Sequence, residues 1–113
     1  MIRACAVGDL GDGQALRLDT EPPIAVFHVE GSFYAIDDTC THQDASLADG
    51  YLEGRSVECP LHASCFSLVT GAPEGLPATR PVRTHEVLVD GGAVFVVPAD
   101  QDSLATGVNG PTP

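Results

Sequence analysis

The sequence has few basic residues, no tryptophan and no long apolar stretch. Five lysines and arginines stand against sixteen aspartates and glutamates, so the formal net charge is −11 at pH 7 with histidine neutral. Nucleic acids and anionic membranes attract cationic surfaces, and this charge balance disfavours both as partners. No run approaches the ~20 apolar residues that cross a bilayer. The residues after Met1 lack the apolar core of a secretory signal, so we expect a cytoplasmic protein.

Helical periodicity is also missing, and the pattern predicts strands instead. No window of ~12 residues has a helical apolar face, and residues 44–49 could form one helical turn at most. Turn-prone segments at 30–31 and 90–92 indicate tight hairpins. Runs rich in β-branched and aromatic residues occur at 2–7, 15–18, 24–29, 32–36, 56–58, 65–69, 87–89 and 93–97. The sequence therefore predicts an all-β fold built as an antiparallel sandwich or barrel.

The length and composition fit one small domain. The chain has 113 residues, of which 43% are hydrophobic, and this is enough for a single core. From Pro98 onward the apolar pattern stops and small, polar and proline residues dominate. We predict one domain over residues 1–98 and a mobile C-terminal tail over residues 99–113.

Two of the four cysteines lie beside histidines. In a reducing compartment, cysteines indicate metal or redox chemistry rather than a disulfide framework. The segments Cys40-Thr41-His42 and Cys59-Pro60-Leu61-His62 each supply one thiolate and one imidazole. A structural zinc site usually takes matched cysteine pairs. Mixed pairs suit two neighbouring irons, as in a Rieske [2Fe–2S] centre, where two histidines replace two cysteines on one iron. A zinc-binding interaction module is an alternative, and it predicts a colourless protein.

The two boxes, together with segment 46–54 (Ser-Leu-Ala-Asp-Gly-Tyr-Leu-Glu-Gly), resemble the small Rieske-type ferredoxins of bacterial aromatic-ring-hydroxylating dioxygenase systems. The resemblance runs from about residue 2 to about residue 97. It implies the Rieske fold, with stacked antiparallel sheets and a cluster-binding subdomain at one tip. It also implies one [2Fe–2S] cluster per chain. Cys40 and Cys59 would hold the inner iron, and His42 and His62 would hold the outer iron near the surface.

The resemblance implies a soluble, monomeric one-electron carrier. Electrons would come from a flavin-dependent NAD(P)H ferredoxin reductase and pass to a terminal Rieske oxygenase. No catalytic residues are expected in this chain, because oxygen activation at a mononuclear iron needs two histidines and a carboxylate. After the two boxes are assigned, only His28 and His85 remain. The alternative is a Rieske-like small subunit bound tightly to a larger reductase, such as a nitrite reductase.

Residues around the boxes predict a low reduction potential. High-potential Rieske proteins of respiratory complexes carry two further cysteines that form a disulfide, and Ala45 and Leu61 occupy those positions here. Those proteins also direct a serine and a tyrosine hydroxyl at the cluster sulfurs. Ser64 keeps the serine, but Phe66 lacks the tyrosine hydroxyl. Fewer donors stabilise an added electron less. Segment 77–81 resembles the proline-containing loop that covers the cluster in this family, and an ordinary surface loop is the alternative.

The remaining polar residues and cysteines have ordinary interpretations. We expect His28 and His85 to be surface or half-buried residues without a special role. Cys5 fits a small buried apolar residue, and Cys65 is either a packing residue or a redox-sensitive thiol. Acidic side chains near the boxes form either a docking surface for a basic partner or a solvated face; they are Asp37, Asp38, Asp44, Asp49, Glu53 and Glu58.

Overall fold

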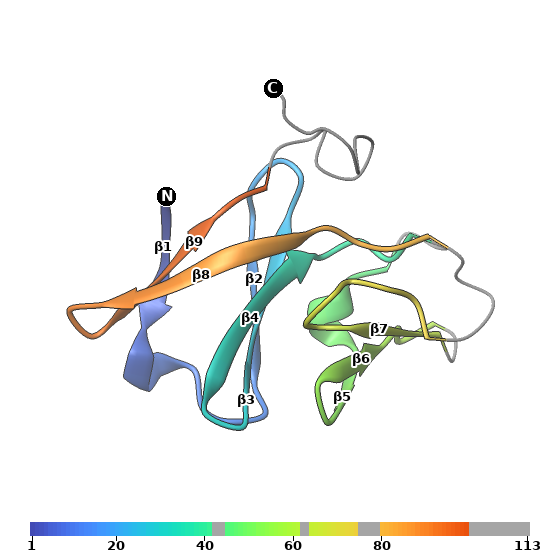
Figure 1. Ribbon diagram of the computed structural model, residues 1–113, viewed down its shortest axis with the longest axis horizontal. Helices are drawn as coiled ribbons and strands as arrows, with labels where there is room; N and C mark the ends of the chain where they lie inside the picture. The colour runs from blue at the N-terminus through green and yellow to red at the C-terminus, as the bar shows by residue number, and fades with distance from the viewer. Residues whose placement is uncertain (42–44, 62–63, 75–79, 100–113) are drawn as a thin grey trace.

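The computed structural model describes residues 1–41, 45–61, 64–74 and 80–99. In these ranges the strands form two antiparallel sheets (Figure 1), one ordered β1-β9-β8-β4-β3-β2 and the other β5-β6-β7. The elements are β1 (Ile2–Ala6), η1 (Val7–Asp9), β2 (Ala15–Leu18), β3 (Ile24–Val29), β4 (Ser32–Asp37), η2 (Leu47–Asp49), β5 (Tyr51–Glu53), β6 (Ser56–Glu58), β7 (Cys65–Ser67), β8 (Thr84–Asp90) and β9 (Ala93–Val97). No helix in these ranges is long and apolar enough to cross a membrane.

The predicted all-β fold is confirmed, and the differences lie in short or polar segments. β8 begins at Thr84, earlier than predicted, because His85 and Thr84 pair with β4. Two short elements are not among those predicted: β5, a three-residue strand, and the 3-10 turn η1. The single helical turn expected within 44–49 is η2. The tail predicted over 99–113 lies outside the described residues except for Ala99.

The burial of β3 on both faces explains why its sequence is almost continuously apolar. Ile24 and Val26 belong to one core cluster, which residues of β1, β4 and β9 complete. The large sheet therefore curls around this core like a barrel. Ala25, Phe27 and Val29 point the other way, into a second cluster that contains residues of β6 and β7. Because side chains alternate along a strand, β3 joins both cores.

The small sheet lies beside the large one and forms a separate subdomain (Figure 1). Val57 of β6 and Phe66 of β7 are fully buried in the second cluster, between the two sheets. The same cluster contains Cys40 and Cys59. The β5-β6-β7 sheet, with the loops that join it to β4 and β8, is the part of the fold that corresponds to the subdomain expected at one tip.

Gly71 brings the chain from the small sheet close to the segment that enters β8. Its φ is +77°, and an added Cβ would meet the carbonyl oxygen of Val82 inside van der Waals contact. The Gly71 carbonyl also accepts a hydrogen bond from the Val82 amide at 2.9 Å. A side chain here therefore faces both a left-handed backbone and a backbone clash.

We expect Gly71→Ala to lower the free energy of unfolding by ~2 kcal/mol or more, because left-handed strain alone costs ~1–3 kcal/mol. Urea unfolding followed by circular dichroism measures the change. Gly91→Ala is the matched control, since Gly91 also has a positive φ, of 59°, but no heavy atom within 4 Å of an added Cβ. Equal losses for both variants would contradict the role of the contact with Val82.

Candidate metal centre

Cys40 lies at the base of the loop that follows β4. Its exposed fraction is 4%, and its amide donates to the Ala45 carbonyl at 3.0 Å. One step outward along the chain, Thr39 and Ser46 form an isolated antiparallel bridge. These contacts close the first box into a loop whose two ends lie side by side, with the thiol held on the inner side.

Cys59 occupies the corresponding place in the turn between β6 and β7. Its exposed fraction is 1%, and its amide donates to the carbonyl of the fully buried Ser64 at 2.9 Å. Leu61, two residues further on, is 62% exposed. The second box therefore runs from the core to the surface within two residues. In both boxes the cysteine amide bonds to the carbonyl five residues later, so the two loops are closed in the same way.

The two cysteines share one buried core cluster although 19 positions separate them in the chain. Both belong to the buried cluster between the sheets. Buried thiols from two closed loops suit a metal cluster that needs two sulfur ligands on its inner side. The other two predicted ligands, His42 and His62, lie outside the described residues. The described part of the chain holds no group of three or more potential metal ligands elsewhere.

The first box is also tied to the segment that leads into β8. The Thr41 hydroxyl donates to the Arg80 carbonyl at 2.8 Å. Arg80 belongs to the segment that the sequence analysis compared with the family's covering loop; residues 77–79 of that segment lie outside the described ranges. The hydrogen bond places the start of the first box against the end of that segment.

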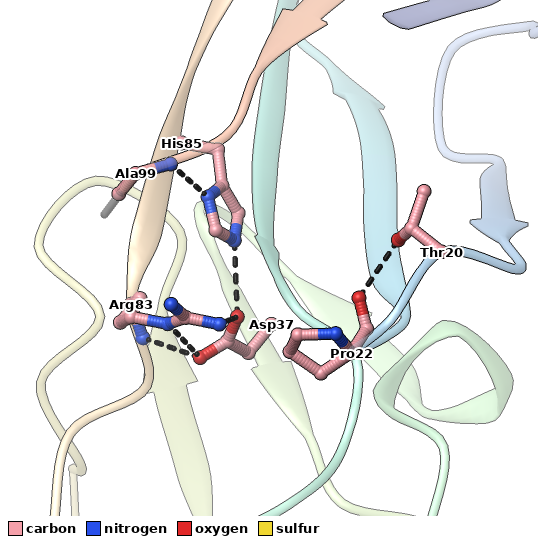
Figure 2. Close-up of polar contacts among 6 residues, drawn as sticks. All are labelled: Thr20, Pro22, Asp37, Arg83, His85 and Ala99. Carbon is pink, nitrogen blue, oxygen red and sulfur yellow. Dashed lines mark hydrogen bonds and ion pairs between the residues drawn. The ribbon is translucent and has the colours of Figure 1, made fainter. Parts of the chain in front are cut away.

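A charged network joins β4 to β8 three residues before Cys40 (Figure 2). Arg83 donates to both oxygens of Asp37, from Nε at 3.0 Å and from Nη2 at 3.1 Å. The His85 Nε2 lies 3.0 Å from Asp37 Oδ1, and the Ala99 amide donates to Nδ1 at 2.8 Å. Because Nδ1 accepts the hydrogen bond from Ala99, it carries no proton, and Nε2 is the nitrogen that donates to Asp37.

This network changes the interpretation of two residues. Burial by itself raises the pKa of Asp37, but hydrogen bonds from His85 and Arg83 outweigh it and hold the pKa below its ordinary value. The expectation that His85 is a surface or half-buried residue was wrong, because its ring is 1% exposed and bonded at both nitrogens. His28 is half-buried as expected, and its ring stacks on Phe33.

The other two cysteines fit packing roles. Cys5 is buried in the barrel core, as predicted. Burial, reinforced by Glu58, Glu74 and Glu53, raises the pKa of the Cys65 thiol. A raised pKa keeps the thiol protonated and unreactive, which favours packing over a redox-sensitive thiol at this position.

Comparison with known proteins decides the nature of the site. A family model described as a Rieske [2Fe-2S] domain matches residues 1–86. The chain belongs to the Rieske family. Its cofactor is accordingly a [2Fe–2S] cluster, and the zinc alternative is set aside. The buried pair of cysteines in two closed loops fits this cofactor.

Individual relatives place this Rieske protein among ferredoxins. It is 54% identical over 96 residues to the 3-phenylpropionate/cinnamic acid dioxygenase ferredoxin subunit of Escherichia coli K12, covering 84% of this chain and 91% of that protein. The ferredoxin of carbazole 1,9a-dioxygenase from Nocardioides aromaticivorans IC177 superposes with a TM-score of 0.82 at 35% identity, covering 87% and 97% of the two chains. This Rieske protein is therefore an electron-transfer component rather than an enzyme.

Two further structural comparisons bear on partners and on the alternative function. A complex of reduced oxygenase and oxidised ferredoxin in carbazole 1,9a-dioxygenase contains a chain with a TM-score of 0.82 and 41% identity, covering 85% of this chain and 91% of that one. A nitrite reductase small subunit from Mycobacterium tuberculosis has a TM-score of 0.76 at 22% identity, covering 87% and 94%. The second likeness shows a shared fold alone.

Proposed function

We propose that this Rieske ferredoxin carries single electrons to the terminal oxygenase of an aromatic-ring-hydroxylating dioxygenase system. A flavin-dependent NAD(P)H ferredoxin reductase supplies the electrons, and the carrier works as a soluble monomer in the cytoplasm. The 54% identity to a dioxygenase ferredoxin subunit supports this assignment over a nitrite reductase subunit. The strongly acidic composition suits a diffusing carrier that meets partners through complementary charge.

We further propose that Cys40 and Cys59 ligate the inner iron and that His42 and His62 ligate the outer iron. The supporting observation is the gradient of exposure in the second box, from 1% at Cys59 to 62% at Leu61. The second box therefore reaches the protein surface at Leu61, where a partner protein can approach. Two neutral imidazoles in place of two thiolates also make the centre less negative and easier to reduce.

The protein's own groups hold and shield this centre. The two cysteine amides close the loops, and the core around Val57 and Phe66 excludes water from the inner side. Residues 1–98 are proposed as the folding unit, with the segment from residue 99 onward as an appended tail. When bound, the cluster supplies reversible one-electron chemistry, and the chain contributes ligands, burial and a surface for partners.

Reconstitution tests the proposed carrier role. The purified chain is combined with a dioxygenase reductase, its terminal oxygenase and an aromatic substrate, and product formation is followed. We expect product only when all three proteins are present, with a rate that rises with carrier concentration. The nitrite reductase alternative predicts instead that the chain co-purifies from its host in fixed stoichiometry with a larger reductase. That result, together with no support of any dioxygenase, would overturn the proposal.

The reduction potential is expected near the low end of the Rieske range, at roughly −150 mV. Phe66 is fully buried and has no hydroxyl to donate, so one donor known from high-potential members is missing. Ser64 is also fully buried and keeps its hydroxyl, so the potential of the Ser64→Ala variant should be lower still. Protein-film voltammetry measures both values. A wild-type potential above about +100 mV contradicts this prediction.

A further inference from the structure

Asp38 is a buried carboxylate two residues before Cys40. The residue is 2% exposed. Its Oδ1 accepts hydrogen bonds from the Ser46 hydroxyl at 2.8 Å and from the Ala48 amide at 3.0 Å. Its Oδ2 lies 3.8 Å from Nε of Arg17, on β2. A buried carboxylate is tolerated only when hydrogen bonds and a counter-charge offset its lost hydration. Loss of the contact with Ser46, Ala48 or Arg17 would therefore cost free energy.

The main chain of Asp38 fastens the same loop. Its amide donates to the Pro23 carbonyl at 3.0 Å, and its carbonyl accepts from the Leu47 amide at 2.7 Å. Asp38 therefore bonds, through backbone and side chain, to residues 46, 47 and 48, which follow the first box. The same residue lies two positions before that box. Both ends of the loop that carries Cys40 are thus held by one amino acid.

The carboxylate is also an electrostatic neighbour of Cys40. Two residues of extended chain span at most about 7 Å, which bounds the distance between the Cα atoms of Asp38 and Cys40. A fixed negative charge at this range opposes the addition of an electron, and a cation beside it offsets the effect. The Arg17 side chain is 52% exposed and is shared with Asp19, which is 88% exposed.

We propose that Asp38 is a positioning residue for the Cys40 loop and that the Asp38–Arg17 pair sets the redox equilibrium of the centre. This inference rests on the proposed assignment of Cys40 as an iron ligand. It makes two separable statements. The hydrogen bonds of Asp38 hold the loop closed around the cluster, and the two opposite charges shift the reduction equilibrium in opposite directions.

The charge statement is tested with two substitutions of opposite sign. Asp38→Asn keeps an acceptor oxygen for Ser46 and Ala48 but removes a negative charge, so the equilibrium constant for reduction should rise about fivefold. Arg17→Gln removes a positive charge and should lower that constant about threefold, less because the arginine is half exposed. Spectroelectrochemical titration of the iron-loaded proteins measures both, with a tenfold change equal to about 59 mV for one electron.

Two exposed charges serve as matched controls. Asp19→Asn removes the other acidic partner of Arg17, and Arg55→Gln removes a cation paired with Glu30 at the hairpin between β3 and β4. That hairpin is at the opposite end of β4 from Cys40, about 17–20 Å away by strand rise. Both controls should change the constant less than twofold. Shifts of the same sign in Asp38→Asn and Arg17→Gln, or equal shifts in the controls, would overturn the charge statement.

The positioning statement is tested by the lifetime of the cluster. Ser46→Ala deletes one hydrogen bond to Asp38 without changing charge, so the visible absorbance at elevated temperature should decay several-fold faster while the potential stays unchanged. If the absorbance of this variant decays at the wild-type rate, the proposal that Asp38 positions the Cys40 loop is overturned. If Asp38→Asn purifies without iron, positioning is supported, and Arg17→Gln still decides the charge statement. If the wild-type protein itself contains no iron, the proposed assignment of Cys40 as an iron ligand is contradicted.

Discussion

Cys59→Ala is expected to purify without iron and without visible colour. The substitution removes one of two thiolates proposed for the inner iron, and a neutral methyl group cannot replace an anionic ligand. Cys59 is 1% exposed within the core between the sheets, so no water-exposed group can take its place there. Colorimetric iron and sulfide assays should fall from about two of each per chain to below one tenth of that level.

Two other cysteines provide the control for this loss. Cys65→Ser and Cys5→Ala change thiols of comparable size, but neither residue belongs to a Cys/His box, and Cys5 lies in the barrel core. Both variants should keep the full iron content and visible spectrum. Retention of the cluster in Cys59→Ala, or its loss in Cys65→Ser, would show that the ligands are assigned to the wrong residues.

Asp37→Ala is expected to lower the free energy of unfolding by ~3–5 kcal/mol, the range for removing one partner of a buried ion pair. The substitution leaves the Arg83 guanidinium, whose side chain is 10% exposed, without its bidentate acceptor. It also removes the partner of His85 Nε2. Urea unfolding of equally iron-loaded samples measures the change. A loss below ~1 kcal/mol would mean that the network contributes little to stability.

The dependence of stability on pH tests the same network with a definite sign. The pKa of Asp37 lies below its ordinary value of 3.8 in the folded protein. The unfolded chain therefore takes up the proton first as the pH falls. The contribution of Asp37 is complete above the ordinary pKa and is lost as the pH falls from there through the folded pKa. The stability difference between wild type and Asp37→Asn should thus shrink below about pH 4, and a difference that grows on acidification would contradict the assignment.

The strands with local apolar signals could be predicted from the sequence, and those defined by distant pairing could not. The nearly continuous apolar run at 24–29 and the turn residues at 30–31 identify the β3–β4 hairpin without further information. The first three residues of β8 are Thr, His and Glu, which give no apolar signal. They form a strand because β4 pairs with Thr84 and His85 and β9 pairs with Glu86. β5 has three residues, too few for a periodic pattern.

The candidate site also has a part that the sequence predicts and a part that only the folded structure shows. Each box places its cysteine and histidine within four consecutive residues, so the proposed ligand set follows from the sequence alone. Asp37 bonds to Arg83 and His85, which lie 46 and 48 positions later in the chain. The bonds of Asp38 to Ser46 and Ala48 span eight and ten positions. Acidic residues in a strongly acidic chain carry no signal that distinguishes these two, and only the folded geometry separates them from the solvated carboxylates nearby.

Electron paramagnetic resonance of the dithionite-reduced protein tests the central claim most directly. Mixed coordination, with two cysteines on one iron and two histidines on the other, predicts an average g value well below that of an all-cysteine [2Fe–2S] ferredoxin. It also predicts hyperfine coupling to two ligand nitrogens. A signal with the all-cysteine average and no nitrogen coupling, or no signal from an iron-loaded reduced sample, would contradict the account.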